Sequence, residues 1–71
     1  MLTIGIPTYN RKNELSELLD NLLKEIKDAN LDNSKIEILI SDNASSDRTP
    51  ELVYEYIKKY PDFINYYRNI I

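Results

Sequence analysis

The chain carries, at residues 36–50, the stretch IEILISDNASSDRTP, which predicts a strand, a polar loop and the start of a helix. Ile36 to Ile40 is largely apolar and β-branched, which is typical of a buried parallel strand with helices on both faces of its sheet. The loop that follows carries two carboxylates, Asp42 and Asp47. Because ligands of open α/β sheets bind beyond the carboxyl ends of the strands, this loop is the first candidate for a functional site.

The segment after this loop predicts a helix and then a further strand. Thr49 can cap the helix with its hydroxyl, and Pro50 suits the first helical position because the N–H that it lacks would be unpaired there. Pro61 ends the helix, and Phe63 to Asn69, rich in aromatic residues, predicts the third strand. The apolar face of the helix consists of Leu52, Val53, Tyr56, Ile57 and Tyr60.

The segment before the stretch predicts a strand and a longer helix. Leu2, Ile4 and Ile6 alternate with small or polar residues until Pro7, which cannot donate to a strand ladder. Asn10 is a candidate N-cap for the helix. The helix itself is predicted by an apolar stripe at a spacing of three and four residues, made of Leu15, Leu18, Leu19, Leu22, Leu23 and Ile26.

Composition excludes several classes of function. The 71 residues include no cysteine and no histidine, so disulfides, thiolate or imidazole metal sites and histidine-dependent nucleophiles are excluded for this chain. A net charge of −3 disfavours nucleic acid and anionic membranes as partners, since both need a concentrated basic surface. The sequence shows neither a membrane span nor a signal peptide, so we expect a cytoplasmic location, with any attachment to the inner face of a membrane made through other segments or partners.

The order βαβαβ predicts a three-layer Rossmann-like α/β fold with parallel strands in the order 3-2-1, because such crossovers are right-handed in nearly all cases. In this topology Pro7, Thr8 and Tyr9 lie beside Asp42 at one rim of the sheet. A carboxylate there can accept a hydrogen bond from a ring N–H of uracil or guanine, and Tyr9 offers a face for stacking. The pattern therefore indicates a nucleotide site.

Two segments resemble the family 2 glycosyltransferases, whose GT-A fold opens with a βαβαβ nucleotide-binding half. They are IGIPTYNR at residues 4–11 and ISDNASSDRT at residues 40–49, the second close to the common family form V-D-D-G-S-T-D-G-T. The resemblance covers essentially the whole chain. This sequence departs from the family form at Asn43, where many members have aspartate, and at Ala44 and Arg48, where many have glycine.

The resemblance implies roles for the matching residues. Pro7, Thr8 and Tyr9 would enclose the base and ribose of a nucleotide-sugar, Asp42 would accept from the base N–H, and Arg11 would lie near the donor. Asn43, Asp47 and Thr49 would shape the loop and start the helix. A UDP-sugar is the favoured donor. These implied contacts are expectations for the structure.

The resemblance also implies an Asp-x-Asp element that holds Mg²⁺ or Mn²⁺ on the diphosphate, and a later carboxylate that acts as general base. Asp-x-Asp does not occur in these 71 residues. We therefore expect residues 1–71 to be the N-terminal, donor-binding part of a longer glycosyltransferase, inactive by itself and without a metal of its own. The alternative is a non-catalytic α/β module that binds nucleotides or serves in assembly.

The predicted topology leaves the first strand, Leu2 to Ile6, at an edge of the sheet. This edge is apolar and carries no protective lysine. We therefore expect it to pair with another chain, for example in a homodimer.

Overall fold

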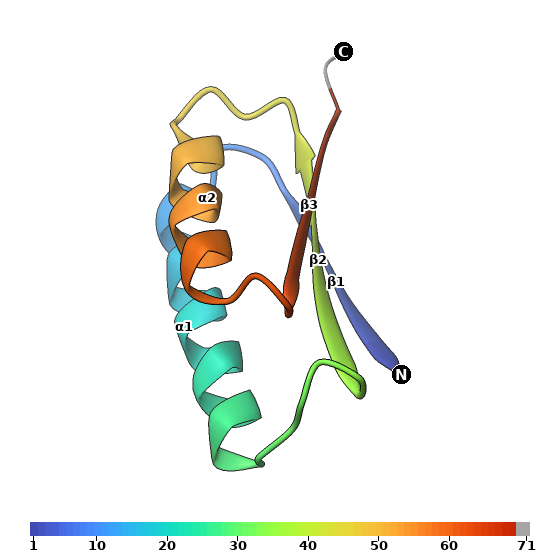
Figure 1. Cartoon of the computed structure of the whole chain (residues 1–71). Helices are drawn as coiled ribbons and strands as arrows, with labels where there is room; N and C mark the ends of the chain where they lie inside the picture. Colours follow the sequence, from blue (N-terminus) through green and yellow to red (C-terminus); the bar gives the residue numbers. More distant parts are fainter. Residues whose placement is uncertain (70–71) are drawn as a thin grey trace.

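The computed structural model describes residues 1–69, which form one βαβαβ unit (Figure 1). The first three elements are β1 (Leu2–Thr8), α1 (Lys12–Asp28) and β2 (Ile36–Asn43), and the last two are α2 (Thr49–Lys59) and β3 (Ile64–Asn69). The number, type and order of the elements agree with the sequence patterns. The fold class predicted from the sequence is thus confirmed.

The three strands are parallel and lie in the order β1-β2-β3, which is the predicted order read from the other side. Two strands are longer than predicted, because pairing continues past the apolar residues into the polar motifs. Pro7 pairs with Ser41, and Thr8 pairs with Asp42. Both motifs therefore begin on the sheet itself.

Proline is accommodated within β1 because that strand lies at an edge of the described sheet. The N–H of Leu2 donates to the carbonyl of Lys35, 2.8 Å away. Since residues of a parallel strand bond alternately to the two sides, the nitrogen of Pro7 faces the free edge, where no ladder bond is lost. Leu2 is 60% exposed at this edge.

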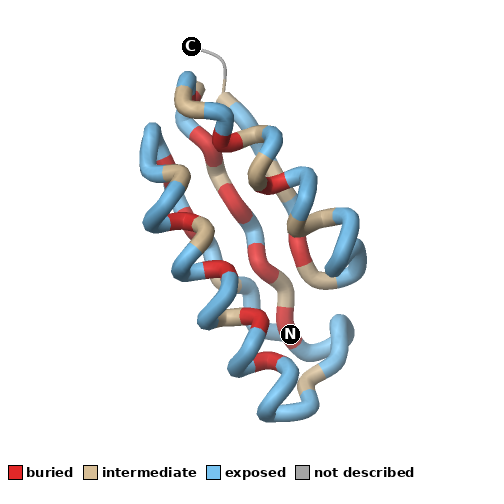
Figure 2. The backbone as a smooth tube through the Cα atoms, turned by 90° about the vertical axis from the view of Figure 1, so that its left-hand side faces the viewer, coloured by how far each residue is buried: buried red, intermediate tan, exposed pale blue. Residues whose placement is uncertain are grey.

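Both helices pack on the same face of the sheet, as Figures 1 and 2 show. The two crossovers run in the same direction across the sheet, and right-handed crossovers of the same direction must use the same face. Residues 1–69 therefore form two of the three layers expected from the sequence, and β2 is covered by helices on one face only. On the other face Leu39 is 37% exposed.

The core lies between this sheet and the helices, and Figure 2 shows buried segments in red on both. The leucines of the apolar stripe of α1 differ in burial. Leu19 faces the sheet and is fully buried, whereas Leu18 lies at the edge of the stripe and is 41% exposed. The buried apolar residues are Ile6, Leu15, Leu19, Leu23, Ile26, Ile36, Ile38, Ile40, Val53 and Ile64.

The helix starts differ from the predictions. Arg11, not Asn10, is the N-cap of α1, and the side chain of Arg11 makes no capping hydrogen bond. Arg48, not Thr49, is the N-cap of α2, which places Pro50 at its second residue. The predicted cap residues instead make hydrogen bonds within and between the loops, Asn10 with Ser46 and Thr49 with Asp47.

The open face of the sheet is polar near the amino ends of its strands. The hydroxyl of Thr3 donates to one carboxylate oxygen of Glu37 at 3.0 Å, and the amide of Asn65 donates to the other at 2.7 Å. A single acidic side chain thus links all three strands across this face.

Replacing Leu19 with alanine tests the position of the core. We expect Leu19→Ala to lower the free energy of unfolding by about 2–5 kcal/mol, because it removes a fully buried side chain and leaves a cavity. Leu18→Ala, one residue earlier in α1 and partly exposed, should cost clearly less. Urea denaturation followed by circular dichroism measures both, and equal losses would contradict this packing.

Candidate functional site

A cavity of about 370 Å³ lies at the carboxyl ends of the strands and combines both sequence motifs. The end of β1 and the β1–α1 loop (residues 9–11) form one side, and the ends of β2 and β3 form the other. The structure thus brings together the two segments that the topology predicted to meet. The cavity is lined by Pro7, Thr8, Tyr9, Arg11, Ser41, Asn43 and Asn69.

Four of the predicted nucleotide-binding residues, Pro7, Thr8, Tyr9 and Arg11, line this cavity. Tyr9 is 57% exposed, so its ring is free to contact a ligand. The hydroxyl of Thr8 is buried and has no hydrogen-bond partner among residues 1–69. Arg11 adds a cation at the rim of an otherwise acidic chain.

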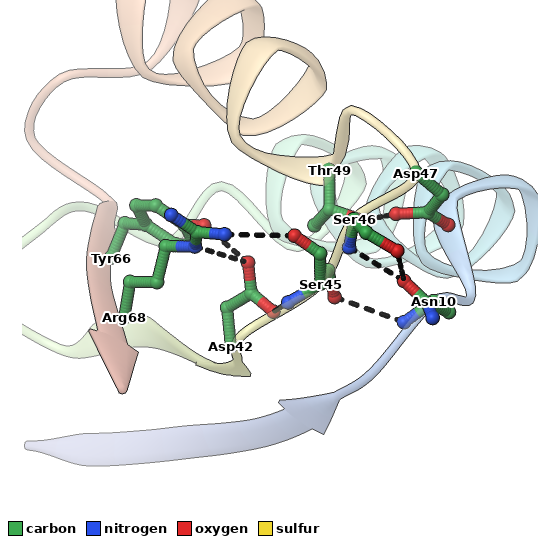
Figure 3. A network of polar contacts seen from close by, with 8 residues as sticks. All are labelled: Asn10, Asp42, Ser45, Ser46, Asp47, Thr49, Tyr66 and Arg68. Carbon is green, nitrogen blue, oxygen red and sulfur yellow. Dashed lines mark hydrogen bonds and ion pairs between the residues drawn. The ribbon is translucent and has the colours of Figure 1, made fainter. Parts of the chain in front are cut away.

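The structure does not bring Asp42 to the cavity. Its side chain lies on the helix-covered face of β2 and is fully buried. One carboxylate oxygen accepts from the N–H of Ser45 at 3.0 Å, and the other accepts a short hydrogen bond from the hydroxyl of Tyr66 and lies 3.7 Å from Nε of Arg68 (Figure 3). The base-reading role predicted for Asp42 does not agree with this geometry, because its oxygens are already engaged inside the protein.

Asp42 is nonetheless charged at neutral pH. Burial by itself would raise the pKa of its carboxyl, but the hydrogen bonds from Ser45 and Tyr66 and the charge of Arg68 outweigh burial and lower that pKa below its usual value. Burial, together with the hydrogen bond to Asp42, raises the pKa of Tyr66, so its hydroxyl remains a donor. The buried site therefore contains an ion pair and a neutral phenol.

Asn43, expected only to shape the loop, lines the cavity instead. It is exposed, and in the sheet register it pairs with Asn69 of β3, which also lines the cavity. The alternation of side chains along β2 predicts that Asn43, rather than Asp42, faces away from the helices. Asp42 follows Ile40 at a spacing of two and so shares its buried face, while Asn43 takes the opposite face.

The β2–α2 loop (residues 44–48) is fixed to the β1–α1 loop by hydrogen bonds around Asn10 (Figure 3). The backbone N–H of Asn10 donates to the hydroxyl of Ser45 at 2.9 Å, and its side-chain oxygen accepts from the N–H of Ser46 at 2.7 Å. The carboxylate of Asp47 accepts from the N–H of Lys12 at 3.0 Å. These contacts set the spacing between the two sides of the cavity.

Asp47 and Thr49 also interact within the loop. The hydroxyl of Thr49, which is fully buried, donates a short hydrogen bond to the second oxygen of Asp47. This hydrogen bond is the main reason why the pKa of the Asp47 carboxyl lies below its usual value. Both residues lie away from the cavity lining and belong to the framework of the loop.

No group of three or more acidic side chains placed to hold a metal ion occurs within the described part of the chain. A larger cavity, about 800 Å³, lies between α1 and α2 and contains none of the motif residues. Residues 1–69 include no helix long and apolar enough to cross a membrane.

The loop backbone explains why glycine is common in the family motif at the positions of Ala44 and Arg48. Ala44 and Arg48 have φ angles of 59° and 68°. Side chains disfavour this left-handed region by about 1–2 kcal/mol, whereas glycine enters it freely. Glycine, common at both places in the resembling family, fits the same loop conformation.

Glycine substitutions test this loop conformation. Ala44→Gly and Arg48→Gly should each raise the free energy of unfolding by up to about 1 kcal/mol, since the relief of strain exceeds the entropy that glycine adds to the unfolded chain. Ala29→Gly is the control, because Ala29 has a φ of −82°. This variant should have a free energy of unfolding lower by about 0.5–1 kcal/mol. Urea denaturation measures all three. A lower free energy of unfolding in all three variants would contradict the left-handed conformation of Ala44 and Arg48.

Comparison with known proteins gives a consistent picture. The sequence model of "Glycosyl transferase family 2" matches residues 3–70. The chain is 45% identical to abequosyltransferase RfbV of Salmonella typhimurium over all 71 residues, which is 20% of that protein. It is 33% identical to dolichyl-phosphate beta-glucosyltransferase ALG5A of Trichomonas vaginalis over 86% of this chain and 20% of that one.

A solved structure shares the fold. The mannosyltransferase PcManGT from Pyrobaculum calidifontis, solved in complex with GDP-Man and Mn²⁺, superposes with a TM-score of 0.78 at 29% identity and covers 94% of this chain and 19% of its own. The chain thus spans about a fifth of the length of these relatives. Because the family match extends over nearly the whole sequence, and the fold and both motifs agree with it, the chain belongs to glycosyl transferase family 2.

Proposed function

We propose that residues 1–71 hold the nucleotide part of a nucleoside diphosphate sugar and so serve as the donor-binding part of a glycosyltransferase. The observation that carries this proposal is the cavity at the strand ends, in which both motifs meet. A cavity at the carboxyl ends of parallel strands is where α/β folds take nucleotides. The family membership supports the same assignment.

Different cavity residues would contact different parts of the nucleotide, according to their chemistry. Tyr9 offers an exposed ring on which a base can stack. Asn43 and Asn69 face the cavity with carboxamides, which both donate and accept hydrogen bonds. Arg11 supplies the positive charge that a diphosphate needs near a chain of net charge −3.

We assign the base contact to Asn43 in place of Asp42. The sequence predicts a UDP-sugar as donor, but Asp42, the predicted acceptor for the ring N–H of the base, is buried. A carboxamide suits uracil and guanine equally, so the proposal covers UDP-sugars and GDP-sugars. The GDP-Man bound by the Pyrobaculum mannosyltransferase supports including guanine.

The chain's part in sugar transfer is to bind and orient the donor. The divalent metal proposed for the longer enzyme would neutralise the diphosphate as the sugar leaves, and residues 1–69 contain no acidic cluster to hold it. A cytoplasmic location is retained as part of the proposal. Cell fractionation with an antibody to this chain tests it.

Nucleotide titrations test the binding proposal. We expect UDP or GDP to bind the chain weakly, and Tyr9→Ala to reduce that affinity by about 5-fold or more, because base stacking on an aromatic ring contributes about 1–3 kcal/mol. Asn43→Ala should reduce it by about 2-fold to 10-fold, the worth of one hydrogen bond.

Calorimetry or NMR titration with UDP and GDP, with and without Mn²⁺, gives the dissociation constants. Asn33→Ala is the matched control, since Asn33 lies in the exposed turn between α1 and β2, away from the cavity. The proposal fails if neither nucleotide binds saturably, or if the control loses as much affinity as Asn43→Ala.

Pairing of the β1 edge between two copies of the chain is a further proposal, supported by the exposure of Leu2 and by the outward N–H groups of Thr3 and Gly5. We expect concentration-dependent dimers in gel filtration with light scattering. Gly5→Pro should abolish them, because it removes one edge donor and a Cβ at Gly5 meets no other atom within 4 Å. A monomer at millimolar concentration contradicts the proposal.

A further inference from the structure

β3 contributes two side chains, Tyr66 and Arg68, that do not line the cavity. Alternation along β3 puts Tyr66 and Arg68 on the helix-covered face, after the buried Ile64. In the sheet register Tyr66 lies beside Ile40, and Arg68 lies beside Asp42. Both are therefore adjacent to the end of β2, where the chain leaves the sheet for the β2–α2 loop.

The two side chains hold both ends of the first turn of this loop. Tyr66 donates its hydroxyl to Asp42, and Arg68 lies 3.7 Å from the same carboxylate oxygen. Nη2 of Arg68 also donates to the carbonyl of Ser45 at 2.8 Å (Figure 3). The N–H of Ser45 in turn donates to Asp42. The segment from residue 42 to residue 45 is thereby closed on itself and attached to β3.

Asn43 lies inside this closed segment. Its neighbours on both sides are constrained, Asp42 by the contacts from β3 and Ala44 by a left-handed φ of 59°. Strand pairing with Asn69 turns the Asn43 side chain toward the cavity, and the bonds made on the opposite face of the sheet fix the neighbours on both sides of it. A side chain that must meet a base edge within a few tenths of an ångström depends on such support.

We propose that Tyr66 and Arg68 are positioning residues for nucleotide binding, acting through Asp42 and Ser45 to hold Asn43 toward the cavity. This inference rests on the proposed function of the cavity. It assigns a role in nucleotide affinity to two residues that do not line the cavity.

The substitutions Tyr66→Phe and Arg68→Lys remove these contacts with little change of volume or charge. Phenylalanine keeps the ring that packs edge-on against Tyr54, whose centroid lies 5.9 Å away. Lysine keeps the charge but lacks the planar guanidinium, whose Nε lies near Asp42 while its Nη2 donates to Ser45. Tyr54→Phe is the matched control, because it removes a hydroxyl from the same ring pair without touching the loop network.

We expect Tyr66→Phe and Arg68→Lys each to lower the affinity for the nucleotide that the unmodified chain binds, UDP or GDP, by about 5-fold to 20-fold, in keeping with the loss of a hydrogen bond to a charged group. Tyr54→Phe should leave affinity unchanged. Circular dichroism first establishes that each variant is folded. Arg68 has a side chain 39% exposed, so its variant is informative even if Tyr66→Phe does not fold.

A double-mutant cycle separates positioning from a general loss of stability. If Tyr66 acts through Asn43, Tyr66→Phe lowers affinity no further once Asn43→Ala is present. Additive losses of affinity, or affinity unchanged in the folded Tyr66→Phe and Arg68→Lys variants, overturn the inference.

If the unmodified chain binds neither UDP nor GDP, the proposed function is refuted. The effect of Tyr66 on the loop can still be tested. Amide exchange at Ser45 and the side-chain NH₂ signals of Asn43 then report the loop directly by NMR. Faster exchange and a shifted or split Asn43 signal in Tyr66→Phe, but not in Tyr54→Phe, support the positioning role. Unchanged signals overturn it.

Discussion

A buried carboxylate at the end of the central strand organises the surroundings of the cavity. Asp42 continues the apolar face of β2 and so enters the core as an anion, which is unfavourable without partners. Its partners come from the following turn, through Ser45, and from the neighbouring strand, through Tyr66 and Arg68. The need to satisfy one charge thus joins the loop to the sheet.

The same requirement shapes the opposite face of the sheet. Once Asp42 is turned inward, the period of two along the strand turns Asn43 outward, beside Asn69. From the other side, the β1–α1 loop is joined to the same turn through Asn10 and Ser45. The cavity is therefore formed by backbone segments whose separation is set by hydrogen bonds outside it.

Local patterns in the sequence were sufficient for the fold. The leucine stripe of α1, the apolar run of β2 and the handedness of crossovers predict the elements and the strand order, and the structure confirms them. Predictions failed where a side chain bonds to a residue outside its own helix or strand. Asn10 and Thr49 have the chemistry of helix caps, but Asn10 bonds to Ser46, 36 residues away, and Thr49 to Asp47 in the adjoining loop. No pattern within one element reveals the choice between such partners.

The sequence predicted which segments line the cavity more accurately than which of their residues do. Pro7, Thr8, Tyr9 and Arg11 could be placed because a topology fixes where strands end. Asp42 was predicted in place of Asn43 because a carboxylate is a strong hydrogen-bond acceptor, although Asp42 lies on the buried face of the strand. Applying the alternation already visible at Ile36, Ile38 and Ile40 to the next residues identifies the outward side chain.

The hydrogen bonds of Glu37 bear on what can pack against the uncovered face of the sheet. Its two oxygens already accept from Thr3 and Asn65, so the side chain is held flat across the strands. A layer that covers this face would therefore meet a surface divided along its length, apolar at Leu39 and anionic at Glu37. An aliphatic side chain suits the first position, and a cation suits the second because it offsets the charge of Glu37.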